Sequence, residues 1–242
     1  MRIADVGGTA VPVDHLIGGE WVGSPTTFES RSPLDWDGGV LANVARGDQT
    51  TADAAVEAAS AGFAVWGNYS VAERAAVMHT MADLIEANND EIAMVESLDM
   101  GFMYESMKNR LVARGAVNFR LYADLIVAHE ERTWDAKNMR NLVQRMPAGP
   151  AVVITPWNAP FMLSTWKLAP ALAAGNSVIH KPAEWSPLSA ALLAELAVLA
   201  GFPPGSYNLV QGVGEEVGAA LVANPGVKRI TFTGSPETGR II

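Results

Sequence analysis

The feature that most constrains this chain is a regular alternation of apolar strands and helices in its carboxyl-terminal part. The pattern predicts strands at 151–155, 177–181, 207–210 and 228–232, with helices at 161–174, 188–200 and 215–222. Strands that are apolar along their whole length are typical of parallel sheets, because crossover helices cover both faces of such a sheet. The sequence therefore predicts an α/β fold with a parallel sheet and flanking helices.

The rest of the chain is organised differently. Residues 1–48 are rich in glycine, proline and short apolar runs, with a strand and turn predicted at Ile17–Val22 and a further strand at Val40–Ala45. Asn141–Met146 alternates between apolar and polar residues and predicts a strand. We interpret it as half of a hairpin that closes at residues 147–150.

Between these strand-rich parts, apolar spacing predicts several helices. Thr50 or Thr51 can cap the first helix. Ser70 and Glu73 form a capping box for the second, because the hydroxyl and the carboxylate satisfy orphan amides at the helix start. A long helix is expected from about residue 104 to about residue 127.

Composition excludes several classes of protein. The net charge of −9 disfavours a nucleic-acid-binding surface, because phosphate backbones bind basic surfaces. The 242 residues include no cysteine, so a disulfide, a zinc–thiolate site, an iron–sulfur cluster and a catalytic thiol are impossible within this chain. Residues 1–8 lack the apolar core of a signal peptide, and no apolar run reaches the roughly 18 residues of a membrane helix. We expect a cytoplasmic protein with no membrane segment and no nucleic-acid partner.

Ligands of parallel sheets bind beyond the carboxyl ends of the strands, which selects a few segments of the sequence. The candidate segments that directly follow predicted strands are Pro156-Trp157-Asn158, Pro182-Ala183-Glu184, Gln211-Gly212-Val213-Gly214 and Thr233-Gly234-Ser235.

Two of these segments are typical of phosphate-binding turns. Gly234 would let a ligand approach the backbone, and a helix starting near Ser235 would attract a phosphate to its amino terminus. The alternative is that Ser235 is an ordinary helix cap. Residues 212–218 have the pattern G-x-G-x-x-x-G, one residue longer than the dinucleotide fingerprint. The alternative there is a glycine turn in which Gly218 permits close helix packing.

Four further residues have side chains that could take part in binding or catalysis. Lys181 can donate to ribose hydroxyls or phosphate, and Glu184 can accept from a ribose diol and repel a 2′-phosphate. The alternative is a solvated ion pair. The amide of Asn158 can donate to a developing oxyanion or can cap the following helix. Lys167 is either a cation near an active site or a surface lysine whose stem lies along the helix.

The histidines and tryptophans point less clearly to function. His180 lies in an apolar strand and is interpreted as a core or edge residue rather than a ligand. The four histidines of the chain show no metal-ligand spacing, so no metal site is expected. The tryptophans are interpreted as packing groups.

The order and spacing of several segments are together more specific than any one of them. The segments are Thr155-Pro156-Trp157-Asn158-Ala159-Pro160, residues 166–176 (WKLAPALAAGN), His180-Lys181-Pro182-Ala183-Glu184 and Phe232-Thr233-Gly234-Ser235, preceded by Gly19-Glu20-Trp21 and Arg31-Ser32-Pro33. This arrangement resembles the aldehyde dehydrogenase superfamily over nearly the whole chain. The resemblance implies a Rossmann-like parallel sheet of the aldehyde dehydrogenase type and part of a strand-rich oligomerisation arm.

The resemblance also implies roles for individual residues. Asn158 would be the oxyanion-hole amide and Lys167 a charge-relay lysine, and Gly214 and Gly218 would lie under the adenine half of an NAD cofactor. The other residues implied to bind the cofactor are Ile154, Thr155, Pro156, Trp157, Lys181, Pro182, Ala183, Glu184, Phe232, Thr233, Gly234, Ser235 and Thr238.

Two parts of the family pattern would lie beyond Ile242: the general-base glutamate and the nucleophilic cysteine. The full-length parent is implied to oxidise an aldehyde to a carboxylic acid through a cysteine thiohemiacetal. This chain would be truncated before the catalytic domain and inactive alone. The alternative is a non-catalytic dinucleotide-binding or assembly module.

The resemblance further implies a division of the chain and a set of partners. The expected parts are an amino-terminal arm (1–20), a helical and strand part of the cofactor-binding domain (21–129), an oligomerisation hairpin (130–150) and an incomplete cofactor-binding core (151–242). NAD is the expected cofactor, with NADP less favoured, and the expected partners are a small aldehyde substrate and further copies in a homodimer or homotetramer. Residues 160–167 are similar to the hydroxymuconic-semialdehyde dehydrogenase branch.

Overall fold

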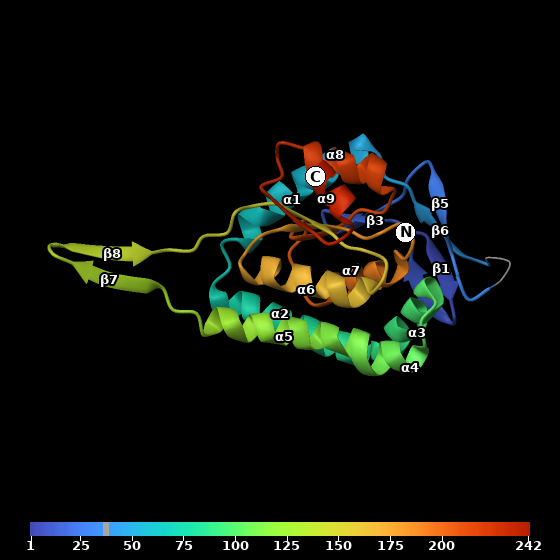
Figure 1. Cartoon of the computed structure of the whole chain (residues 1–242), viewed down its shortest axis with the longest axis horizontal. Coiled ribbons are helices and arrows are strands. Elements are labelled where there is room, and N and C mark those ends of the chain that lie inside the picture. The colour runs from blue at the N-terminus through green and yellow to red at the C-terminus, as the bar shows by residue number, and fades with distance from the viewer. Residues whose placement is uncertain (36–38) are drawn as a thin grey trace.

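A six-stranded sheet lies at the centre of the computed structural model, which describes residues 1–35 and 39–242 (Figure 1). Its parallel part consists, in spatial order, of β12 (Arg229–Phe232), β9 (Ala151–Ile154), β10 (Val178–Lys181) and β11 (Tyr207–Leu209). Beyond β11 the sheet continues antiparallel with β3 (His15–Ile17) and β4 (Glu20–Val22). The predicted α/β fold with a parallel sheet is confirmed.

The strand order reverses at β9. From β9 the chain adds β10 and β11 on one side and then returns to add β12 on the other. In open α/β sheets the crossovers diverge at such a reversal, so a crevice is expected at the carboxyl edge of the strands. This crevice between β9 and β12 is the expected ligand site of an open α/β sheet.

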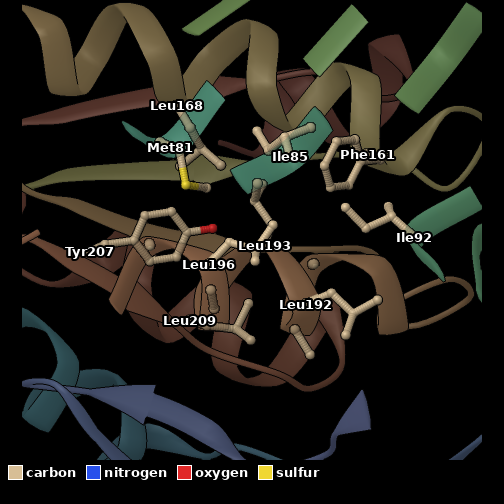
Figure 2. Close-up of a cluster of buried hydrophobic side chains, with 14 of the residues drawn as sticks. Met81, Ile85, Ile92, Phe161, Leu168, Leu192, Leu193, Leu196, Tyr207 and Leu209 are labelled. Carbon is tan, nitrogen blue, oxygen red and sulfur yellow. The ribbon is translucent and has the colours of Figure 1, made fainter. Parts of the chain in front are cut away.

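One face of the sheet is covered by a thick helical layer. Val153 and Leu209 point into it, and its helices are α2 (Val71–Ala87), α3 (Asn89–Met100), α5 (Ala113–Val127), α6 (Pro160–Ala173) and α7 (Leu188–Leu199). Figure 2 shows Leu193 of α7 in the same cluster as Ile85 of α2 and Leu168 of α6. Since α7 is buried along most of its length, it forms the middle of this layer.

The opposite face is covered by shorter elements. Val152 and Ile179 alternate with the residues that face the thick layer, as the two-residue period of a strand requires. They pack against α1 (Gln49–Trp66), the π-helical turn η2 (Gly214–Gly218) and α8 (Ala219–Ala223). The crossover from β11 to β12 thus lies on the other face from α6 and α7, which explains the divergence at β9.

The first two helices begin at side-chain caps, one of which differs from the prediction. Asp48, rather than Thr50 or Thr51, caps α1, because its Oδ1 accepts from Thr51 N at 2.9 Å. Thr51 is the reciprocal partner, and its Oγ1 accepts from Asp48 N at 3.3 Å. The predicted box at α2 is confirmed: Ser70 Oγ accepts from Glu73 N at 3.2 Å, and Glu73 Oε2 accepts from Ser70 N at 2.7 Å.

The predicted long helix is helical but not uniform. It consists of α4 (Tyr104–Ser106), the π-helical segment η1 (Met107–Val112) and α5, which packs against α2 and α6. A π-helical segment shifts the helix phase by widening one turn, which periodicity over the whole stretch does not reveal.

A two-stranded hairpin projects away from the body of the molecule (Figure 1). Here β7 (Arg132–Ala136) pairs antiparallel with β8 (Met139–Val143). The hairpin closes at residues 137–138, where Lys137 has a φ of 53°. Closure at 147–150 is therefore wrong, because those residues lead from β8 into β9. A turn residue with positive φ is usually Gly, Asn or Asp, so Lys137 gave no signal in the sequence.

The remaining strands are at the amino terminus: β1 (Ile3–Val6) pairs with β2 (Thr9–Pro12), and β5 (Thr27–Arg31) pairs with β6 (Val40–Ala45). The predicted turn in 17–22 joins β3 to β4 through Gly18 and Gly19, both with positive φ. Through this hairpin β3 and β4 form the antiparallel end of the central sheet.

A buried polar network fixes three strands to α6. His180 Nε2 lies 3.1 Å from Thr155 Oγ1 and 3.0 Å from Ser164 Oγ, and its Nδ1 lies 3.1 Å from Tyr207 Oη. Ser164 donates to Pro160 O at 2.6 Å, and both nitrogens of the buried imidazole lie within hydrogen-bond distance of a hydroxyl group. The interpretation of His180 as a core residue is confirmed.

This network predicts a pH dependence of stability. Burial lowers the pKa of His180 from its usual 6.5 to about 3, and nearby Lys181 acts in the same direction. The unfolded chain binds this proton more readily, so the stability it contributes is complete above about pH 6.5 and is lost as the pH falls toward 3. In denaturant titrations, His180→Gln should lose less stability than the unmodified chain between about pH 7 and pH 4. His129→Gln, at an exposed position, is the control, and equal pH slopes for His180→Gln and the unmodified chain would contradict the prediction.

Candidate functional site

The carboxyl edge of the sheet brings three of the four predicted segments together. Thr155 N donates to Lys181 O, and Thr233 N donates to Ile154 O, each at 3.2 Å. These bonds extend the pairing of β9 with β10 and with β12 by one residue. The loops that carry Trp157-Asn158, Glu184 and Gly234-Ser235 therefore start side by side, around the crevice between β9 and β12.

The fourth segment contributes only partly. Gln211 is buried, and its side-chain Nε2 donates to Pro187 O at 3.3 Å, so its side chain belongs to the core. Gly212 has a φ of 138°, and a Cβ there would lie 2.8 Å from Val217 Cγ1, which identifies a glycine-dependent turn. Gly214 at the start of η2 is exposed and faces open space.

Lys181 is a buried cation at the end of β10. Its side chain is 2% exposed, and its Nζ donates to Glu184 Oε2 at 3.2 Å. Burial lowers the pKa of Lys181, while the attraction of Glu184 acts in the opposite direction. The pair is not the solvated one of the alternative interpretation. An ammonium has three N–H donors, so Lys181 can serve further acceptors besides Glu184.

The surroundings of this pair shape the opening. A Cβ on Gly218 would lie 3.8 Å from Lys181 Cε, an ordinary contact distance, so η2 lies next to the lysine stem without requiring glycine at this position. Pro182 is buried and Ala183 is half-buried, so both form the turn that presents the partly exposed Glu184.

The loop after β9 exposes two predicted residues. Asn158 is exposed and does not cap α6, because Ala159 occupies the cap position. The capping interpretation of Asn158 is therefore wrong, and its amide is left for another partner. The same loop is joined to the loop after β10 by Ser186 Oγ, which donates to Trp157 O at 3.2 Å.

Lys167 lies on α6 and reaches the end of β12. Its Nζ donates to Thr231 Oγ1 and to Phe232 O, both at 3.2 Å. It is not a surface lysine of the snorkelling kind, and its partial burial lowers its pKa. A second cation therefore stands at the same edge as Lys181.

In the segment after β12 the interpretation of Ser235 as a helix cap is confirmed. Ser235 is a helix cap, because its Oγ accepts from Thr238 N at 3.1 Å at the start of α9 (Pro236–Ile241). A Cβ on Gly234 would lie 2.4 Å from Phe232 Cζ, so only glycine fits beneath the phenylalanine ring. The turn thus needs glycine for packing, and it leaves Ser235 exposed at the crevice.

A cavity of about 630 Å³ adjoins this edge and was not predicted from the sequence. Trp157 and Trp185, which are 57% and 72% exposed, line it together with Glu184. The interpretation of the tryptophans as packing groups is wrong for this pair, although it holds for the fully buried Trp66. A tryptophan directly after the candidate Glu184 was the signal in the sequence.

Two buried carboxylates beneath the loops were also missed. Glu96 and Asp99 of α3 bond to backbone N–H groups at the starts of α6 and α7. Across residues 1–35 and 39–242, no group of three or more histidine, aspartate or glutamate side chains is placed to hold a metal ion. Within the same residues, no helix has the length and apolarity needed to cross a membrane.

Comparison with known proteins shows the family of the chain. The model of the aldehyde dehydrogenase family matches residues 21–242. The chain is 43% identical over 239 residues to the 2-hydroxymuconic semialdehyde dehydrogenase of Pseudomonas sp. (strain CF600), covering 95% of this chain and 49% of that protein. It is 39% identical to the 5-carboxymethyl-2-hydroxymuconate semialdehyde dehydrogenase of Escherichia coli, with coverage of 95% and 49%. The predicted similarity to the hydroxymuconic-semialdehyde branch is confirmed.

Solved structures of aldehyde dehydrogenases also match this chain. An NAD⁺ complex of indole-3-acetaldehyde dehydrogenase matches with a TM-score of 0.94 and 36% identity, covering 98% of this chain and 48% of that one. An NAD⁺ complex of aldehyde dehydrogenase from Bacillus cereus matches with a TM-score of 0.91 and 37% identity, covering 95% and 47%. The chain spans about half the length of the relatives it matches, and it belongs to the aldehyde dehydrogenase family.

Proposed function

We propose that the whole protein containing this chain oxidises an aldehyde to a carboxylic acid and uses NAD as the hydride acceptor. The observation that carries the proposal is the exposed Asn158 amide in the loop after β9, the strand that lies between β10 with Lys181 and β12, whose end bonds to Lys167. The named activities of the two semialdehyde dehydrogenase relatives support a semialdehyde as the substrate class.

The residues at the edge fit a dinucleotide. Lys181 is buried with N–H donors to spare, and ribose hydroxyls are suitable acceptors for them. Glu184 can accept from the same diol, and its charge would repel a 2′-phosphate, which favours NAD over NADP. Gly214 leaves open space for the adenine half, and the exposed turn at Gly234-Ser235 is our candidate for the pyrophosphate.

The chain's own residues prepare the reaction without completing it. Bound NAD would supply the hydride acceptor. Asn158 would donate an N–H to the oxygen of the aldehyde as negative charge develops there. Lys167 would add positive charge near the same edge. The nucleophile must come from elsewhere in the whole protein, because this chain has no cysteine.

A second candidate role is assembly, and the projecting hairpin favours it. Trp134, Met139 and Val143 share one face of β7–β8, and the first two are 46% and 67% exposed. A two-stranded hairpin is at best marginally stable in water without further packing. We infer that a second copy of the chain covers this face, in a homodimer or homotetramer.

The first prediction from the proposed function tests the role of Glu184 in cofactor choice. Glu184→Ser in the whole protein should lower the ratio of kcat/KM with NAD to that with NADP by about tenfold, the effect of roughly 1.4 kcal/mol. Glu130→Ser, which removes an equal charge at an exposed position before β7, should leave the ratio unchanged. An unchanged ratio in Glu184→Ser would refute the assignment, and a wild-type protein inactive on every aldehyde would refute the proposed function.

The second prediction concerns the 242-residue chain by itself. It should form no NADH from NAD and an aldehyde, because it contains no thiol for the covalent step. Circular dichroism establishes that the purified chain is folded, and absorbance at the NADH band measures turnover. Turnover that survives removal of contaminating enzymes would show that the covalent mechanism does not apply.

The third prediction addresses the hairpin. Replacing Trp134 and Met139 by serine should reduce the mass of the oligomer, measured by light scattering, because the shared apolar face is lost. Thr133→Ser changes the opposite face of β7 and serves as the control. An oligomer of unchanged mass in the double variant would exclude this hairpin as the main contact.

A further inference from the structure

Two helices that border the crevice begin without a side-chain cap of their own. Ala159 and Pro187 occupy the cap positions of α6 and α7, and neither provides an oxygen for the first backbone amides. Buried helix starts need an acceptor, because an unsatisfied N–H in an apolar core is costly. In both helices the acceptor comes from α3.

Glu96 supplies the acceptor for α6. Both of its carboxylate oxygens lie near Phe161 N, at 3.1 and 3.2 Å, and the glutamate is fully buried. Pro160 has no N–H, so Phe161 is the first residue of α6 with a donor to satisfy. The backbone amide that Glu96 bonds is therefore that of Phe161, three residues after Asn158.

Asp99 supplies the acceptor for α7. Its Oδ2 accepts from Leu188 N at 2.9 Å, and its Oδ1 accepts from Ser30 Oγ at 2.5 Å. Glu96 and Asp99 are three residues apart and share one face of α3. One helix thus holds the two loops that follow β9 and β10.

The charge of these groups suits their position. A helix amino terminus carries positive partial charge, so a carboxylate is favourable there. Burial opposes ionisation and raises the pKa of both Glu96 and Asp99 to about 7. Either protonation state leaves at least one oxygen free to accept from a backbone amide.

The turn that Glu96 holds is also confined from the other side. A Cβ on Gly115 of α5 would lie 2.5 Å from Phe161 Cε1, so the ring packs directly on the α5 backbone. Phe161 is therefore fixed by a hydrogen bond to its backbone and by contact with its ring. Asn158, with no such contact of its own side chain to α6, takes its position from this turn.

We propose that Glu96 is a positioning residue, which aims the Asn158 amide at the reacting oxygen by fixing Phe161 at the start of α6. The inference rests on the proposed function, since it concerns the oxyanion contact of that site. Glu96 does not touch the crevice and acts through the backbone of four residues. Asp99 has the corresponding place beneath the loop of Glu184, and it provides a matched comparison on the same helix.

The test is a double-mutant cycle in the whole protein. Asn158→Ala should lower kcat by about 10²–10³, the cost of one oxyanion donor. Glu96→Ala should lower kcat by roughly 10–100-fold with little change in the KM for NAD, because a shift of about 1 Å is enough to lose that much. Added to Asn158→Ala, it should lower kcat no further, since the group that it positions is already absent.

Three comparisons complete the experiment. Glu96→Gln retains an oxygen acceptor for Phe161 N and should restore most of kcat. Asp99→Asn or Asp99→Ala should raise the KM for NAD more than it lowers kcat. If Glu96→Ala does not fold, Glu96→Asp replaces it, because its carboxylate is one methylene short of Phe161.

The outcomes separate the two ideas. Equal losses from the Glu96 change in the presence and absence of Asn158 would overturn the positioning role and leave the proposed function intact. Normal kcat in Asn158→Ala would overturn both the oxyanion assignment and the positioning role. The inference would be supported if Glu96→Ala lowers kcat only in the protein that retains Asn158, and if Glu96→Gln restores kcat.

Discussion

The reversal of strand order at β9 is the constraint on which the rest of the structure depends. Parallel strands need crossover connections, and those after β9 and β10 pass over one face while the one after β11 passes over the other. The loops after β9 and β12 consequently open away from each other. Asn158 and Glu184 lie in the loops at this carboxyl edge, Lys181 is at the end of β10, and Lys167 bonds to the end of β12, although the four residues come from separate elements.

The loops at the opening are exposed, but what holds them is buried and polar. His180 connects β9, β10, β11 and α6 through hydroxyl groups, and the carboxylates of α3 hold the starts of α6 and α7. Buried polar groups are costly unless each has a partner, so such a network has few alternative arrangements. In return for this cost in stability, each loop is held in one position. Catalysis requires such a fixed geometry.

Features that depend on residues close together in the sequence could be predicted, whereas features that depend on residues far apart could not. The strand–helix alternation and the Ser70–Glu73 box depend on neighbouring residues, and both are confirmed. The hairpin turn at Lys137 was missed because its residue type does not reveal a positive φ. Glu96 lies 65 residues from Phe161 in the sequence, and a glutamate on a helix is ordinarily a surface residue. Local patterns therefore located the candidate site, while the groups that support it required the tertiary structure.

The electrostatics of the edge connect the fold to its ligand. The chain is acidic overall, with a net charge of −9, yet two lysines with lowered pKa values stand at the crevice. Removing an ammonium from water is unfavourable, and one carboxylate at 3.2 Å compensates Lys181 only in part. A ligand that brings hydroxyl or phosphate oxygens to this position would satisfy the remaining N–H donors and relieve that cost. Burial of Lys181 in the fold thus prepares the edge for an oxygen-rich ligand before one arrives.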